Sequence, residues 1–385
     1  MKSRALPLVV VALLLAAGCT SNARPDANSP RSLTVTATDS ACHVSAATAP
    51  AGTLTFSVTN SGASVTEFYL LAADGLRVVA EVENIGPGIT RDLVLAAAAG
   101  TYFTACKPGM TGGGIRATFT VSDSGQSVGP TGADAELVAT ANTQYAAYVR
   151  DQVDQLVAAT KAFTDAYAAG RDDEARALYA AARVHWERIE PVAESFGDLD
   201  PKMDGREADL EEGEAWTGWH RMEKDLWPQR AESYTPLTTA ERKALADDLV
   251  ANTAVLYDPT RSMTFTADAI ANGAKSLLDE VATGKVTGEE EYWSRTDLYD
   301  FQANVDGARV AWLGLQPVLQ RKAPTLDTDI STRFAELQSL LDKHKVGTSG
   351  FVTYDTLSGA DVKALSDAVN ALGEPLSKMA AAVLA

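Results

Sequence analysis

Several acidic and histidine side chains are spaced so that they would share one face of a helix. Residues three apart in a helix are neighbours on its surface, and three such pairs occur in the second half of the chain: His220 with Glu223, Glu187 with Glu190, and Asp297 with Asp300. Helical bundles build metal sites from inward-facing carboxylates and histidines on opposed helices. Oxygen ligands with a single imidazole suit iron, manganese or zinc better than copper(I). The spacing therefore predicts a metal site inside a bundle.

A solvated acidic surface is the alternative interpretation of each pair. The chain has 51 acidic residues, so carboxylates three apart arise often by chance, and for Asp297 and Asp300 this plain interpretation weighs more. His220 and Glu223 differ, because large apolar side chains flank them, namely Trp216, Trp219, Met222 and Trp227. A buried charge without a partner is costly. The pair is therefore expected on a partly buried face, where a partner or a metal ion would compensate its charge.

Nucleophilic and peptidase chemistry find little support. The sequence has no G-x-S-x-G motif, and its four histidines leave few bases for a catalytic triad. Zinc peptidases of the usual kind carry H-E-x-x-H, which places two imidazoles on one helix. His220 has Glu223 three residues later, but no second histidine follows nearby. A metal-dependent peptidase is therefore the alternative from the enzyme class, and a metal-free adhesion or scaffold lipoprotein is the third interpretation.

The elements that must position these residues are helices. Beyond residue 133 the apolar pattern has a helical period, with candidate helices near 134–169, 171–190, 206–227, 239–257, 264–283, 288–321, 328–345 and 359–383. Pro191 follows Glu190 directly, so the helix that carries Glu190 is expected to end or kink there. Residues 32–122 instead alternate in short runs separated by turn residues, which is typical of a small β-sandwich. The sequence thus predicts a β domain (32–122), a linker (123–133) and an all-α bundle (134–385).

The first residues predict export and a lipid anchor. Lys2 and Arg4 precede an apolar run that is too short to span a bilayer, which is typical of a signal peptide over residues 1–18. Small residues before Cys19 look like a bacterial lipobox, so lipidation is expected at Cys19, followed by a tether over residues 19–31. The alternative is a plain signal peptide that leaves Cys19 as an odd thiol. The formal net charge of -18 argues against nucleic-acid binding.

Three segments resemble a known family. The stretch from Gly218 to Glu223 is similar to the G-x-H-x-x-E signature of imelysin-like domains, and residues 187–202 and 297–308 resemble further segments of the EfeO/EfeM branch of that group. The β domain resembles the cupredoxin-like domain that the EfeO type carries in front. The resemblance covers nearly all of the chain beyond the signal peptide, with the order of the motifs preserved.

This resemblance implies a function and a ligand set. It implies an exported component of an elemental iron uptake system, anchored at the cell envelope, that works with a membrane iron permease and a haem peroxidase-like protein. Capture and delivery of iron is the expected activity, and oxidation or hand-over of iron by the β domain is the alternative that would add a catalytic step. The bundle is implied to bind iron through the H-x-x-E motif and nearby carboxylates, which places His220, Glu223, Glu187 and Glu190 in the site, with Asp297 as the first addition.

The β domain has two interpretations. The resemblance implies a metal site there, for copper, iron or zinc, formed by Cys42 and Cys106 with Glu67 and Glu81. A type 1 copper loop would hold Cys, His and Met close together, whereas the chain has no histidine between Cys106 and the methionine that follows it. A disulfide between Cys42 and Cys106 is the alternative, and it is natural for an exported protein. The residues alone weigh both interpretations equally.

Overall fold

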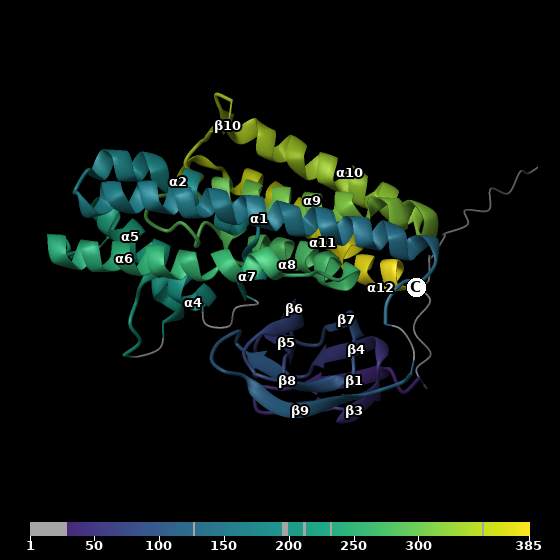
Figure 1. The fold of residues 1–385 in the computed structure, drawn as a ribbon. Coiled ribbons are helices and arrows are strands. Elements are labelled where there is room, and N and C mark those ends of the chain that lie inside the picture. The colour runs from purple at the N-terminus through teal and green to yellow at the C-terminus, as the bar shows by residue number, and fades with distance from the viewer. Residues whose placement is uncertain (1–28, 126–127, 195–198, 211–212, 232, 349) are drawn as a thin grey trace, which may run out of the picture.

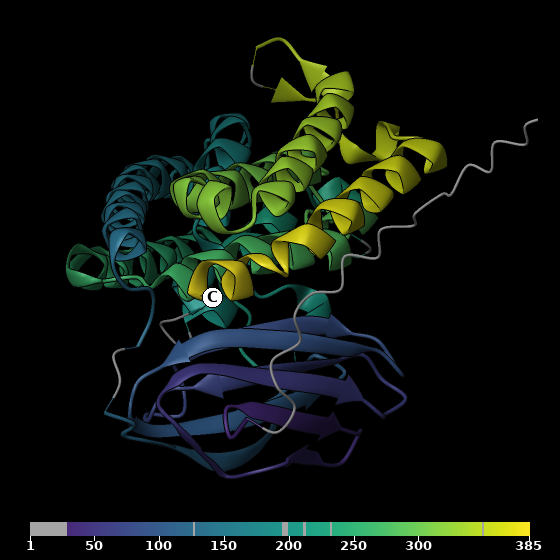
Figure 2. The ribbon, with the colours of Figure 1, turned by 90° about the vertical axis from the view of Figure 1, so that its right-hand side faces the viewer.

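The computed structural model describes residues 29–125, 128–194, 199–210, 213–231, 233–348 and 350–385. It places a β-sandwich beneath an elongated layer of helices, as the two perpendicular views show (Figures 1 and 2). The predicted combination of an amino-terminal β domain and a carboxy-terminal helical bundle is therefore confirmed. The predicted signal peptide, Cys19 and most of the predicted tether lie outside the described residues.

Two sheets form the β domain. The first has the order β2-β1-β4-β7 and the second the order β3-β9-β8-β5-β6. Phenylalanines from both sheets meet in the core between them, with the ring centroids of Phe56 and Phe68 5.2 Å apart. The alternation that the sequence shows is the reason, because successive residues of a strand face opposite sides. The strands are β1 (Ser32–Ala37), β2 (Cys42–Val44), β3 (Thr48–Pro50), β4 (Gly52–Asn60), β5 (Thr66–Leu71), β6 (Val78–Ile85), β7 (Thr90–Ala97), β8 (Gly100–Pro108) and β9 (Ile115–Ser122).

Helices make up most of the described residues beyond 132, together with short 3-10 turns, irregular connections and a small hairpin of β10 (Lys345–Val346) and β11 (Gly350–Phe351). Local signals fix several of their starts: Thr238 and Glu241 form a capping box before one helix, and Ser358 and Asp361 form another. The helices are α1 (Ala133–Ala168), α2 (Asp172–Glu187), α3 (Glu190–Glu194), α4 (Leu199–Asp204), α5 (Gly218–Leu226), α6 (Thr239–Val255), α7 (Tyr257–Ser262), α8 (Ala267–Thr283), α9 (Asp297–Lys322), α10 (Pro324–Leu341), α11 (Gly359–Leu376) and α12 (Met379–Leu384).

Two expected helices are shorter than the sequence pattern suggests. Of the segment 206–227 only Gly218–Leu226 is α-helical, and the segment expected from 288 becomes helical only at Asp297. Gly218 has a φ of 84° and packs so closely on the end of α4 that a Cβ atom there would overlap the carbonyl oxygen of Met203. A glycine is required at such a position. It lets α5 begin directly against α4, which brings the two helices' polar residues together.

Helix α8 joins the two domains. It contacts β6 and β7, and α12 also contacts β7 (Figure 1). Hydrogen bonds run from the Ala96 amide to Asp268 Oδ2 (2.8 Å), from Asn272 Nδ2 to the Val94 carbonyl oxygen (3.0 Å), and from Ser276 Oγ to Glu81 Oε1 (3.2 Å). The β domain is therefore docked on the bundle mainly through side chains of α8, with further contacts from α11 and α12. In the part of the chain that the structure describes, every helix is too short or too polar to cross a bilayer.

Candidate metal centre

A buried polar cluster lies inside the bundle, where the ends of several helices meet. Helix α2 supplies its last turn, α4 its last residue and α5 its first turn, and the turn that precedes α9 passes between them. The residues that these elements bring together are Arg183, Glu187, Asp204, His220, Glu223, Glu290, Glu291, Asp297 and Asp300, and each is buried. The predicted site residues on α2, α5 and α9 therefore lie in one place.

His220 stands at the centre of the cluster with no exposed surface. Its Nδ1 lies 3.3 Å from Glu223 Oε2, and its Nε2 lies 3.2 Å from Asp204 Oδ1 and 3.6 Å from Glu290 Oε1. Although burial and the Arg183 guanidinium disfavour the charged ring, the surrounding carboxylates raise the pKa of His220 well above its ordinary value. In the metal-free protein a proton on the ring balances these carboxylates.

Three ligand atoms converge on one point beside the ring. The ligand atoms of Asp204, His220 and Glu290, one from each residue, lie within 4.8 Å of one another, which suits a shared metal ion. His220 Nε2 faces both carboxylates, although neither contact has the geometry of a hydrogen bond. Although burial favours its protonated form, Lys285 and His220 lower the pKa of Glu290 to about 2. Although burial opposes it, Arg183 and His220 also hold the pKa of Asp204 well below its ordinary value, so both carboxyl groups are charged at neutral pH.

Glu223 is fixed by the backbone of the turn that precedes α9. Its Oε1 accepts hydrogen bonds from the amides of Trp293 (2.8 Å) and Ser294 (2.6 Å), which leaves Oε2 to face His220. Ligand atoms of His220, Glu223 and Glu291 form a second group within 4.8 Å of one another. The predicted pairing of His220 with Glu223 on one face of a helix is present in the structure. The imidazole of His220 therefore has carboxylates beside both of its ring nitrogens.

The other predicted ligands contact different partners. Asp297 accepts a hydrogen bond from the Glu291 amide (3.1 Å), and burial raises the pKa of Asp297 to about 7. Glu187 and Glu190 face Lys285, whose Nζ lies 3.0 Å and 3.2 Å from their carboxylate oxygens. Among the described residues, these three predicted ligands are absent from the groups of ligand atoms that include His220, whereas Asp204 and Glu290 lie beside its Nε2.

Two buried cations belong to the cluster. Arg183 has no exposed surface, and its guanidinium contacts Asp204, Glu187 (2.5 Å) and Glu291 (2.6 Å). Lys285 is equally buried. Buried charges require partners of opposite sign, so these two side chains hold part of the acidic cluster together without metal. The sequence spacing gave no signal for Arg183, Asp204, Lys285, Glu290 or Glu291, because none of them forms a helical pair with His220.

The proposed cysteine ligands of the β domain are corrected by the structure. Cys42 and Cys106 form a disulfide, with a Cα–Cα distance of 5.5 Å, so neither sulfur is available as a thiolate ligand. Cys106 also belongs to the core between the sheets, whereas Glu67 faces the opposite side of its sheet and accepts a hydrogen bond from Tyr69. Glu81 accepts one from Ser276 of α8. The four residues do not converge, because neighbouring strand positions alternate between faces.

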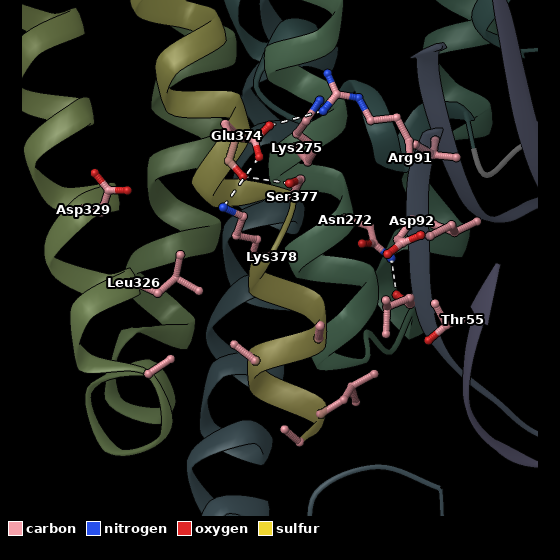
Figure 3. A pocket seen from close by; sticks show the side chains of 18 of the residues that line it. Thr55, Arg91, Asp92, Asn272, Lys275, Leu326, Asp329, Glu374, Ser377 and Lys378 are labelled. Atoms are coloured by element: carbon pink, nitrogen blue, oxygen red, sulfur yellow. Dashed lines mark hydrogen bonds and ion pairs between the residues drawn. The ribbon is translucent and has the colours of Figure 1, made fainter. Parts of the chain in front are cut away.

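A cavity with a volume of about 1690 Å³ lies between the domains. Figure 3 shows it between strand residues such as Arg91 and helix residues such as Glu374 and Lys378. Some of its charged side chains pair with one another: Glu374 lies 3.2 Å from Arg91 and 3.6 Å from Lys378. None of the predicted ligands on α2, α5 and α9 lines this cavity, so it is separate from the polar cluster inside the bundle.

Comparisons with known proteins agree with this architecture. The family model described as Imelysin matches residues 141–379, and the one described as a cupredoxin-like domain matches residues 8–121. The Iron uptake system component EfeO of Yersinia pestis is 38% identical over 348 residues, which cover 90% of this chain and 89% of that protein. The protein of the same name from Escherichia coli K12 is 37% identical over 351 residues, with the same coverage of each chain. The chain therefore belongs to the imelysin family, and within it to the EfeO/EfeM type that carries a cupredoxin-like domain in front.

Proposed function

We propose that this protein captures iron at the cell envelope and delivers it to a membrane iron permease. The observation that carries the proposal is the convergence of His220, Asp204 and Glu290 on one point within the bundle. Two carboxylates and one imidazole form a hard ligand set that suits iron. The name of the relatives, a component of an iron uptake system, supports iron as the cargo.

Charge balance explains why the cluster would bind a cation. Eight buried carboxyl groups surround two permanent cations, Arg183 and Lys285; they are Glu187, Glu190, Asp204, Glu223, Glu290, Glu291, Asp297 and Asp300. Burial raises the pKa of Glu187 to about 8 and that of Asp300 to about 6, so the metal-free cluster retains protons. An iron ion would replace some of these protons and the proton of His220. Binding is therefore expected to release protons.

The proposed location follows from the amino terminus. Residues 1–18 have the features of a signal peptide, and Cys19 is proposed as the lipidated residue that holds the protein at the membrane. A tether that starts at Cys19 would let the two domains work beside a permease. A haem peroxidase-like protein of the same uptake system is proposed as the second partner.

The proposal assigns no catalytic step to either domain. Each group of ligand-type side chains around His220, among the described residues, contains carboxylates but no second histidine, so the two-imidazole site of common zinc peptidases has no counterpart there. In the β domain, the disulfide removes the thiolates that a copper centre would use. We propose that this domain acts by docking on α8.

Iron titration of the full-length protein tests the proposal. Calorimetry with iron(II) under nitrogen should show one ion per chain, and His220→Ala should weaken binding by more than about tenfold, because removing even a residue that supports a ligand costs 10- to 100-fold. His185→Ala is the matched control, because His185 bonds Gln152 outside the cluster. Equal affinities of the parent and His220→Ala would place the site elsewhere. A parent protein that binds no iron would refute the function itself.

A further inference from the structure

Lys285 occupies an unusual place for a lysine. It follows the end of α8 directly and is completely buried in the acidic cluster. Its Nζ lies 3.0 Å from Glu187 Oε2, 3.2 Å from Glu190 Oε2 and 3.9 Å from Glu290 Oε1. Burial alone would remove the charge of a lysine, but these carboxylates raise the pKa of Lys285 well above its ordinary value. The cluster therefore contains a fixed ammonium ion.

The position of the ammonium adjoins the position proposed for iron. The same atom, Glu290 Oε1, lies 3.6 Å from His220 Nε2 and 3.9 Å from Lys285 Nζ. Asp204 connects the carboxylates of the two positions, because it groups within 4.8 Å with His220 and Glu290 and also with Asp200 and Glu190, and Glu190 contacts Lys285. The two neighbouring cation positions thus share the Glu290 carboxylate, and neighbouring cation positions are the arrangement of a dinuclear site.

Oxygen atoms of two carboxylates and one amide surround the position of the Lys285 ammonium. Asn304 donates hydrogen bonds from Nδ2 to Glu187 Oε2 (3.2 Å) and to Glu190 Oε2 (3.1 Å), which holds both carboxylates beside the ammonium. Oδ1 of Asn304 is buried and has no hydrogen-bond partner among the described residues. Carboxylate and amide oxygens are ligands that hard metal ions accept. The lysine therefore fills a position whose walls would also suit a metal ion.

We propose that the cluster has two adjacent cation positions, one for iron at His220 and one filled by the Lys285 ammonium, and that Lys285 thereby limits the protein to a single metal ion. This inference rests on the function proposed above. Bundles that hold two iron ions use carboxylates and Glu-x-x-His pairs on facing helices. With a lysine in the second position, iron has no neighbouring ion with which to share a bridging carboxylate. The site is then suited to holding and releasing one ion.

Replacing Lys285 by an uncharged residue of similar length is the test. Full-length parent protein should bind one manganese(II) ion, used as a stable probe, whereas Lys285→Met should bind two. Electron paramagnetic resonance should then detect coupling between the two ions, which would lie close enough to share carboxylates. Lys285→Arg is the matched control, because it keeps the positive charge, and it should bind one ion.

Each outcome of this experiment is decisive. A folded Lys285→Met protein that binds one ion overturns the inference but leaves the proposed function intact, whereas a parent that binds neither manganese(II) nor iron(II) refutes the proposed function. If Lys285→Met does not fold without metal, two equivalents of manganese(II) should restore its melting temperature, because ions that bind only the folded state stabilise it. Failure of manganese(II) to restore folding would also overturn the inference.

Discussion

Nε2 of His220 lies 3.2 Å from Oδ1 of Asp204, although the two residues belong to different helices. The contact joins the only predicted imidazole ligand to a carboxylate that the sequence did not reveal. Asp204 in turn contacts the Arg183 guanidinium and accepts a hydrogen bond from Trp186 Nε1 (2.7 Å). One aspartate therefore connects the candidate metal position to the permanent charge of the cluster.

Asp204→Asn tests this connection. The change removes a buried negative charge but leaves an oxygen that can accept from Trp186. Breaking a buried ion pair from one side costs about 3–5 kcal/mol, and the other carboxylates around Arg183 should keep the loss near the lower value. Chemical unfolding of the metal-free protein measures it, and calorimetry should show iron affinity reduced by more than about tenfold.

Asp209→Asn is the control for Asp204→Asn. Asp209 pairs with Arg206 at the surface, with 47% of its side chain exposed, so its loss should change the unfolding free energy by less than about 1 kcal/mol. An Asp204→Asn protein with the stability and iron affinity of the parent would contradict the assigned role of Asp204.

The stability of the metal-free protein should depend on pH in a direction that added metal opposes. Burial raises the pKa of Glu187 from 4.5 to about 8 and that of Asp297 from 3.8 to about 7, so the folded state holds more protons than the unfolded state between those limits. The unfolding free energy of the metal-free protein should therefore fall as pH rises from about 5 to 8. His220 acts in the same direction, because its pKa is raised on folding.

Added iron or manganese should oppose this fall, because the ion requires deprotonated ligands and binds more tightly as pH rises. Melting temperatures recorded across this pH range, with and without metal, measure both effects. The binding enthalpy should also depend on the ionisation enthalpy of the buffer, since protons are released. A metal-free protein whose stability rises from pH 5 to 8 would contradict the assigned protonation states.

Gly218→Ala should damage the site without changing any ligand. The added Cβ would overlap the Met203 carbonyl oxygen, and the φ of 84° is unfavourable for alanine. We expect lower stability and weaker iron binding, because α5 would move away from α4 and separate His220 from Asp204. Gly359→Ala is the matched control: a Cβ atom at this residue, which begins α11, would have no heavy atom within 4 Å outside its immediate neighbours. It should be neutral or slightly stabilising.

The disulfide should be separable from metal binding. Unreduced protein should show no reactive thiol at Cys42 or Cys106. Replacing both by serine should lower the unfolding free energy by about 2–4 kcal/mol, while the bundle should retain its iron affinity. A thiol count of two for these residues, or loss of bundle binding in the double variant, would contradict this separation.

Cys19→Ser should release the protein from membranes. The variant lacks the thiol that lipidation requires, and the chain would lose the acyl groups that hold it at the bilayer. Fractionation of cells, with the variant and the parent compared, measures the effect. A Cys19→Ser protein that still sediments with membranes would refute the lipid anchor.

Periodicity was sufficient to predict the division into a β domain and a bundle, and to place His220 beside Glu223. It failed where contacts depend on irregular segments. Glu290 and Glu291 lie in the turn that precedes α9, within a segment whose pattern had favoured a helix. Asp204 ends a helix of six residues, too short for a clear period.

Burial of charge was the other feature that the sequence concealed. The chain has 33 lysines and arginines, and nothing in their spacing distinguishes Arg183 and Lys285 from those at the surface. Only the tertiary arrangement surrounds these two side chains with carboxylates, and these carboxylates offset the free-energy cost of burying the two positive charges. The role of the two cysteines could not be predicted from the sequence either. They are 64 positions apart, and only the placement of their strands shows that they form a disulfide and do not bind a metal ion as thiolates.

Helix α8 gives the β domain a mechanical connection to the cluster. Along its length it bonds β6 and β7 through Ser276 and Asn272, and directly beyond its end stands Lys285. A helix moves along its axis almost as a rigid body. A displacement of the β domain that shifts α8 would therefore change the position of the Lys285 ammonium relative to Glu187 and Glu190. The contacts of the β domain with α8 and the ion pairs of Lys285 in the cluster are therefore mechanically linked.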